Sequence, residues 1–195
     1  MISNELLNSQ SLKLIKNFKE DNPKIYDIVA YGSVVRGKML PKDTDLAIIL
    51  HQKLSFDKKL GLAQELRHCL GKILKSEIDV KCVDMDDLTD PLFIARKAII
   101  AEGLSMTRKK NLAEAFGFKP FYIFTYSLSG LSHSKKVIFG YALGGRRGQE
   151  GLLKLNKCEQ LGKGAIKVPL EHAEEFKDFF EKQNVKYRVH MALIY

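Results

Sequence analysis

The chain has 195 residues, of which 45% are hydrophobic and 28% charged, so we expect a globular core and exclude a disordered or fibrous chain. The formal net charge is +9 at pH 7, and residues 104–170 carry much of it, with twelve Lys or Arg against three Glu. A basic segment of this kind favours a polyanionic partner, nucleic acid above all, although a merely soluble basic surface would have the same composition.

The cysteines and the first residues indicate a cytoplasmic protein. Cys69, Cys82 and Cys158 are scattered and form no CxxC pair, which favours free thiols over a disulfide framework or a zinc site. No apolar run is long enough to cross a membrane, and the N-terminus lacks the basic start and apolar centre of a signal peptide. We therefore expect a cytoplasmic location and no membrane partner.

Helices and strands are expected to alternate along the first half of the chain, which is typical of a sheet covered by helices. The expected helices cover residues 5–20, residues 55–75 and the stretch from Asp86 or Asp87 to Gly103. The expected strands cover residues 25–31, 44–50 and 77–83. Pro41-Lys42 marks a loop between the first two strands.

A softer boundary follows near the charged run Arg108-Lys109-Lys110 and Pro120, and it predicts two domains, residues 1–106 and residues 107–195. In the second domain we expect the following elements: strands over 121–126, 165–168 and 185–194, a helix through Val137 and Tyr141, a glycine-rich basic loop over 143–151, and a helix from Pro169 that buries Phe176, Phe179 and Phe180. Its strands either form a second small α/β unit or extend the first sheet.

A possible phosphate-binding turn follows the first strand, in Tyr31-Gly32-Ser33-Val34-Val35-Arg36-Gly37. The absence of a side chain at Gly32 lets a phosphate approach the backbone closely, and N–H groups at the start of the next helix would face the anion. The Ser33 hydroxyl adds a donor, and Arg36, one turn later, can pair with phosphate oxygens.

Three aspartates on two strands predict a metal site. Asp43 and Asp45 are two residues apart at the start of a strand, so their side chains share one face. Asp79 lies within the strand over 77–83, and it completes a three-carboxylate cluster if the two strands are neighbours. Crowded carboxylates repel each other, and a hard divalent cation such as magnesium relieves that repulsion.

Glycine-serine, a spacer of about ten residues and then Asp-x-Asp between apolar residues resembles the signature of the polymerase-beta-like nucleotidyltransferase superfamily. The continuation is similar to that of its minimal nucleotidyltransferase group, common in archaea and bacteria. It consists of Ile78-Asp79-Val80, Val83-Asp84, Pro91-Leu92-Phe93 and Ala101-Glu102-Gly103. The resemblance covers roughly residues 10–106, and residues 107–195 resemble no family that we recognise.

The resemblance implies an α/β (α+β) fold with a mixed sheet and helices, followed here by a small basic α/β C-terminal domain. It also implies two magnesium ions held by Asp43 and Asp45, with Asp79 as a further ligand that helps to activate the attacking hydroxyl. Gly32 and Ser33 would bind a nucleoside triphosphate such as ATP. The reaction would be in-line attack on the α-phosphate with release of pyrophosphate.

One position departs from the pattern of the group, because many members carry Arg directly after Gly-Ser and this chain has Val34. Arg36 matches the second basic position of the group and is the third expected nucleotide-binding residue. We therefore expect one phosphate contact to be absent, which bears on triphosphate affinity, while all three aspartates are present.

In the second half, Arg146 and Arg147 in the glycine-rich loop, with Lys135 and Lys136 before it, are candidates for RNA binding. An ordinary basic surface loop is the alternative interpretation. The five histidines are dispersed and are interpreted as surface or core residues, and the acidic run Asp84, Asp86 and Asp87 as helix capping.

Three functions remain in competition. The first is a magnesium-dependent enzyme that moves a nucleoside monophosphate from a nucleoside triphosphate to a hydroxyl of an RNA or protein acceptor. The second is an antitoxin-like partner of a small helical toxin in a toxin-antitoxin pair. The third is a nucleic-acid-binding module whose transferase fold is vestigial.

Overall fold

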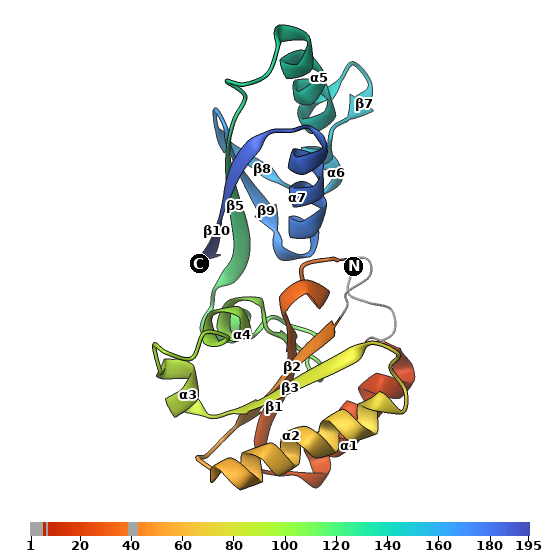
Figure 1. Cartoon of the computed structure of the whole chain (residues 1–195), viewed down its shortest axis with the longest axis vertical. Coiled ribbons are helices and arrows are strands. Elements are labelled where there is room, and N and C mark those ends of the chain that lie inside the picture. Colours follow the sequence, from red (N-terminus) through yellow and green to blue (C-terminus); the bar gives the residue numbers. More distant parts are fainter. Residues whose placement is uncertain (1–5, 7, 39–42) are drawn as a thin grey trace. The chain divides into compact units, whose positions relative to one another are not determined.

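A computed structural model describes residues 6, 8–38 and 43–195, so the predicted loop at Pro41-Lys42 lies outside the described residues. The chain forms two compact units. The first, unit 1, extends to Lys119, and the second, unit 2, covers Pro120–Ile194. Figure 1 shows the elements of both units, which we describe separately. Among the described helices, none has the length and apolar composition that a bilayer span requires.

Unit 1 is built on a four-stranded mixed sheet with the strand order β3-β2-β1-β4. Strand β1 is antiparallel to β2 and β4, whereas β2 and β3 are parallel. The elements are α1 (Ser9–Asp21), β1 (Ile25–Tyr31), the 3₁₀ helix η1 (Gly32–Val34), β2 (Asp43–Leu50), α2 (Phe56–Gly71), β3 (Glu77–Val83), α3 (Met85–Thr89), α4 (Arg96–Glu102), β4 (Leu104–Ser105) and the 3₁₀ helix η2 (Leu112–Phe116).

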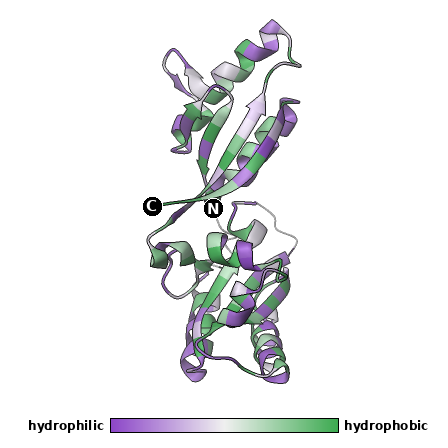
Figure 2. Cartoon of the chain, turned by 90° about the vertical axis from the view of Figure 1, so that its left-hand side faces the viewer, coloured by the Kyte–Doolittle hydropathy of each residue, from purple (hydrophilic) through white to green (hydrophobic). Residues whose placement is uncertain are grey.

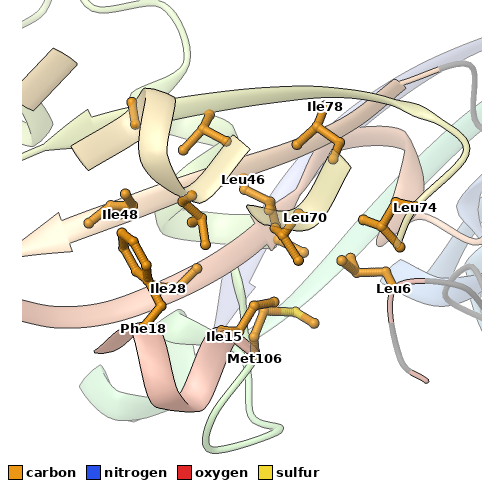
Figure 3. Packing of buried hydrophobic residues seen from close by; sticks show 14 of the residues in the cluster. Leu6, Ile15, Phe18, Ile28, Leu46, Ile48, Leu70, Leu74, Ile78 and Met106 are labelled. Atoms are coloured by element: carbon orange, nitrogen blue, oxygen red, sulfur yellow. The ribbon is translucent and has the colours of Figure 1, made fainter. Parts of the chain in front are cut away.

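Helices α1 and α2 cover one face of this sheet, and α3 and α4 lie on the other (Figure 1). The larger core lies under α1 and α2, where Ile15 and Phe18 meet Ile28 and Leu46 (Figure 3). The smaller core, on the opposite face, contains Val29, Ala47 and Ile99. Because side chains alternate between the faces of a strand, residues of β1 and β2 contribute to both cores.

The single helix predicted to end at Gly103 is wrong, because the structure has two helices, α3 and α4, with a break between them. Asp90 has an extended backbone at the end of α3, as expected of a residue that precedes a proline. The cap is Asp84, whose side chain accepts from the backbone of Asp86 and Asp87 in a capping box. Capping of α3 therefore accounts for the acidic run, as predicted.

Unit 2 contains a separate four-stranded sheet with the order β10-β5-β9-β8, so its strands do not extend the first sheet. Its elements are β5 (Lys119–Ser127), α5 (His133–Gly144), β6 (Gly145–Arg146), β7 (Gln149–Glu150), α6 (Leu152–Leu155), β8 (Glu159–Gly162), β9 (Ala165–Pro169), the 3₁₀ helix η3 (Leu170–His172), α7 (Ala173–Lys182) and β10 (Lys186–Ile194). The β6–β7 hairpin and α6 are inserted between α5 and β8 of a strand-helix-strand-strand-helix-strand order.

The core of unit 2 is aromatic. Phe124, Phe139, Phe176 and Phe180 are buried there, and Phe179 packs against them. The predicted interior position of the phenylalanines of α7 is therefore confirmed. Phe124 and Phe180 stack with ring centroids 5.6 Å apart, so β5 and α7 are joined by ring contacts as well as by buried area.

The boundary between the units follows Lys119, later than the predicted boundary after residue 106. The segment between the two boundaries packs on unit 1, because Leu112 is buried against its smaller core and Arg108 forms an ion pair with the buried Asp27 of β1. A charged run can therefore hold a segment to a domain, and here it does not mark a linker.

Candidate active site

The turn after β1 requires a glycine. Gly32 has a φ of +75°, a left-handed backbone conformation that side chains disfavour. A Cβ atom at this position would lie 2.6 Å from Oδ2 of Asp45, which leaves no room for it. The absence of a side chain therefore lets the turn lie directly against a carboxylate of the predicted site.

Replacement of Gly32 by Ala should disturb this contact. We expect Gly32→Ala to lower the free energy of unfolding by about 1–3 kcal/mol, because it forces a disfavoured φ and displaces the Asp45 carboxylate. Urea denaturation measures this loss. Gly61→Ala is the matched control, because Gly61 is on α2 with open space around its Cα and should not lose stability. Equal stability of Gly32→Ala and the wild type would contradict the close packing.

Glu102, at the end of α4, ties the turn together, and the sequence analysis did not identify it as a site residue. Its side chain is 2% exposed and accepts hydrogen bonds from the Gly32 backbone N–H, at 3.1 Å, and from Nη1 of Arg36, at 2.9 Å. The Gly32 N–H therefore donates to the Glu102 carboxylate, whereas the sequence analysis expected a phosphate at this turn. The only sequence signal was the stretch Ala101-Glu102-Gly103, to which no role was attached.

Position 34, where many members of the group carry Arg, is interior in this chain. Val34 is 0% exposed and packs in the larger core under α1 and α2. Ser33, between Gly32 and Val34, is half-buried, and Arg36 is half-buried in its ion pair with Glu102. A phosphate contact from position 34 would require the side chain to leave the core.

The carboxylates are brought together by strand pairing. Asp45 of β2 lies directly opposite Asp79 of β3, and Asp43 lies opposite Glu77. On the other side of β2, Asp45 is paired with Tyr31, the last residue of β1. Because side chains alternate along a strand, Asp43, Asp45 and Asp79 share the face of the sheet that carries α3 and α4.

The site is electrostatically crowded. Burial, and then the neighbouring charges of Asp43 and Asp79, raise the pKa of the Asp45 carboxyl above its usual value. Burial also raises the pKa of the Tyr31 phenol, and Asp45 and Asp79 add to that effect. The Tyr31 hydroxyl is buried and has no hydrogen-bond partner among the described residues. A bound cation would offset the negative charge around Asp45, and a hydrogen-bond donor of a ligand would give the Tyr31 hydroxyl a partner.

Asp79 already has positive partners. Nζ of Lys81 is 2.5 Å from Oδ2 of Asp79, and Nη2 of Arg67 is 3.9 Å from Oδ1. Within the described ranges, no three His, Cys, Asp or Glu side chains lie close enough together to hold a metal ion. The donor chemistry nevertheless fits magnesium, because hard carboxylate oxygens converge on one face and their mutual repulsion disfavours the ionised form of Asp45.

The basic loop of unit 2 is a tight hairpin formed by β6 and β7. Gly145 and Gly151 make it possible, because a Cβ at either position would lie within 2.5 Å of backbone atoms. Arg146 and Arg147 line a hollow of about 460 Å³, and Lys135 and Lys136 do not line it. The guanidinium of Arg146 lies over the Tyr141 ring at 4.8 Å, so part of this positive charge is held against the protein.

A mixed four-stranded sheet in which a glycine turn meets paired aspartates defines an α/β domain of the nucleotidyltransferase type. The chain belongs to the polymerase beta nucleotidyltransferase family, because the model of that family matches residues 13–110, about half of the chain. This family assignment confirms the resemblance and the fold class that the sequence predicted. Among curated proteins, no sequence matches this chain.

Several solved structures resemble part of the chain. A crystal structure of the toxin-antitoxin complex MntA–HepT is 22% identical over 51% of this chain and 71% of that chain, with a TM-score of 0.35. A tri-AMPylated HEPN toxin of Shewanella oneidensis in complex with its MNT antitoxin is 21% identical over 53% and 73%, with a TM-score of 0.35. A toxin-antitoxin structure with AMP-PNP is 22% identical over 54% and 84%, with a TM-score of 0.38. Similarities at this level carry no argument about the partners or substrates of this chain.

Proposed function

We propose that this protein is a magnesium-dependent nucleotidyltransferase that moves a nucleoside monophosphate from a nucleoside triphosphate such as ATP to a hydroxyl of an RNA or protein acceptor. The observation that carries the proposal is the register of β2 and β3, which sets Asp45 opposite Asp79 and beside the Gly32 turn. Family membership supports the same class of reaction.

In this proposal Gly32, Ser33 and Arg36 bind the triphosphate, and Asp43, Asp45 and Asp79 hold magnesium. The bound metal would stabilise the negative charge on the attacking and leaving oxygens. The acceptor oxygen forms a bond to the α-phosphorus, the bond to the β-phosphate oxygen breaks, and pyrophosphate leaves. The acceptor proton passes to Asp79, whose Oδ2 lies 2.5 Å from Nζ of Lys81.

The test is incorporation of label from each of the four α-labelled nucleoside triphosphates into total RNA or cell extract, with magnesium. We expect carboxylate-dependent label in wild type and none with Asp43→Ala plus Asp45→Ala or with EDTA. Asp57→Ala plus Asp178→Ala is the matched control, since both aspartates are exposed, on α2 and α7, and neither lies on the strands that carry the three site aspartates. Label in the control and not in the site variant supports the proposal.

The acceptor decides between the competing functions. Label in RNA supports an RNA-modifying enzyme, whereas label on a single protein supports the antitoxin-like function, in which a partner is modified. Absence of carboxylate-dependent label with every acceptor would reject both enzymatic versions and leave the vestigial, binding-only interpretation.

A further inference from the structure

The sheet of unit 2 has one face packed and one face open. Tyr122 and Phe124 of β5 are buried in the core beneath α5 and α7, and the alternate residues Phe121, Ile123 and Thr125 point to the opposite face. Both helices lie on the same side of the sheet (Figure 1). Figure 2 shows the other side, where hydrophilic and hydrophobic residues alternate along the strands.

Strand pairing extends this face across the sheet. Ile123 lies opposite Lys167 of β9, so the two side chains share the face, and Nζ of Lys167 lies 5.1 Å from the centre of the Phe121 ring. On β10, Lys186 and Arg188 are exposed and alternate with residues that pack in the core. The open face is the set Phe121, Ile123, Thr125, Lys167, Lys186 and Arg188.

Charge is segregated between the two sides of unit 2. Residues 120–194 contain twelve Lys or Arg and seven Asp or Glu, and five of the seven acidic residues lie within residues 171–181. That segment is η3 and α7, on the helical side. Of the other two, Glu150 forms an ion pair with Lys154, and Glu159 lies opposite Lys167 on the open face and forms an ion pair with it.

A shallow hollow of about 680 Å³ adjoins the open face where β5 and β10 meet. Lys186 and Arg188 line it together with Thr125, Tyr126 and Tyr187. No acidic side chain of the described residues forms an ion pair with Lys186 or Arg188. Cations without an ion pair are thus concentrated on β10 at the open face, while the rings of Tyr126 and Tyr187 pack against Phe180 on the core side.

We propose that the open face of unit 2 binds single-stranded nucleic acid. An exposed sheet surface with aromatic side chains offers stacking positions for unpaired bases, and flanking cations bind the phosphates between them. Lys186 and Arg188 hold the backbone, while Phe121 and Ile123 of β5 contact bases. A duplex fits less well, because its bases are already stacked on one another.

The open face suits this ligand better than the β6–β7 hairpin does. The hairpin hollow is lined by glycines, charged residues and Gln149, and no aromatic residue is part of its lining. It therefore offers charge without a stacking surface. Binding of nucleic acid does not depend on the transferase reaction, but the use of this face to hold an acceptor strand rests on the proposed function.

The test measures anisotropy of a fluorescein-labelled 12-nucleotide single strand, as RNA and as DNA, with the full chain and without triphosphate or magnesium. We expect Lys186→Ser plus Arg188→Ser to weaken binding at least tenfold at 0.1 M salt. The slope of log affinity against log salt should fall by about 1.4, since each phosphate contact on a single strand contributes about 0.7. Phe121→Leu should weaken binding without changing that slope.

Two further double variants identify the surface. Lys177→Ser plus Lys182→Ser removes the same charge from α7 and should leave affinity within about twofold of wild type, if local contacts rather than net charge bind the strand. Equal weakening by this control, or a loss confined to Arg146→Ser plus Arg147→Ser, would overturn the proposal. So would the absence of wild-type binding to both strands.

The two proposals fail separately. Asp43→Ala plus Asp45→Ala should bind the strand as wild type does, because the measurement requires no triphosphate and no metal. Normal binding by Lys186→Ser plus Arg188→Ser would reject the open face even if nucleotidyl transfer persists. Preference for RNA over DNA would indicate contacts to the 2′-hydroxyl, whereas equal affinity would indicate recognition through phosphates and bases alone.

Discussion

Asp45→Asn should reduce nucleotidyl transfer by about a thousand-fold or more and, without metal, should make unit 1 more stable. Loss of a carboxylate that holds the metal removes several kcal/mol of transition-state stabilisation, and about 4 kcal/mol corresponds to a thousand-fold in rate. The gain in stability has a different origin. In the folded chain the Asp45 carboxyl is partly buried beside Asp43 and Asp79, and an amide at this position carries no charge.

The pH dependence follows from the direction of the pKa shift. Folding raises the pKa of Asp45 above its usual 3.8, so the folded chain favours the protonated form. The stability from that preference is present at low pH and is lost as the pH rises through the folded-state pKa. The melting temperature of Asp45→Asn in EDTA should therefore exceed that of wild type at neutral pH, and the difference should shrink towards pH 4.

Asp57→Asn is the control for both measurements, because Asp57 is exposed in the first turn of α2 and should alter neither the rate nor this pH profile. A folded Asp45→Asn protein that keeps a tenth or more of wild-type activity would contradict the assigned role of the carboxylate. A melting temperature below that of wild type at neutral pH would contradict the proposed crowding.

The strands of unit 1 were predictable from local composition. The predicted strands over residues 25–31 and 77–83 agree with β1 and β3, because runs of β-branched and aromatic residues match a sheet buried on both faces. Alternation along β3 puts Asp79 and Lys81 on one face, and the 2.5 Å contact between them is known only from the structure. The predicted helix after β3 was wrong, because Asp90-Pro91 interrupts it. Ile94, in the segment between α3 and α4, is 91% exposed.

The parts that could not be predicted depend on distant partners or on weak patterns. Glu102 meets Gly32 and Arg36 across more than sixty intervening residues, and no local pattern marks a glutamate that will be buried. Strand β8 was missed because all four of its residues are exposed and show no apolar alternation. The exposed face of α5 carries Val137 and Ile138, so apolar residues alone did not indicate which side is interior.

The second large effect is expected at the ion pair between the buried Asp27 of β1 and Arg108 in the segment that follows β4. Asp27 is 0% exposed and accepts from Nη2 of Arg108 at 2.7 Å and from Nε of Arg108 at 3.2 Å. The hydroxyls of Ser105 and Thr107 also donate to its carboxylate. Arg108→Ala would leave a buried carboxylate without its counter-ion and should cost about 1–3 kcal/mol of unfolding free energy, less than for a fully buried pair because the Arg108 side chain is 43% exposed.

A double-mutant cycle separates the ion pair from general disruption. Asp27→Asn keeps the shape and removes the charge, so Asp27→Asn plus Arg108→Ala should be destabilised by clearly less than the sum of the single variants. Urea unfolding followed by far-UV circular dichroism suits a chain without tryptophan. Asp178→Asn in unit 2 is the control, and additive single effects would show that the two residues do not act as a pair.

The same pair should also affect the active site. Ser105 and Leu104 of β4 pair with Val29 and Ala30 of β1. Ala30 directly precedes Tyr31 and the Gly32 turn. Loss of the Asp27–Arg108 contact frees β4 on one side of β1, while β2 still holds the other side. Arg108→Ala should therefore lower nucleotidyl transfer even under conditions in which unit 1 is folded, and Lys110→Ala, which removes a neighbouring charge with no such ion pair, should not.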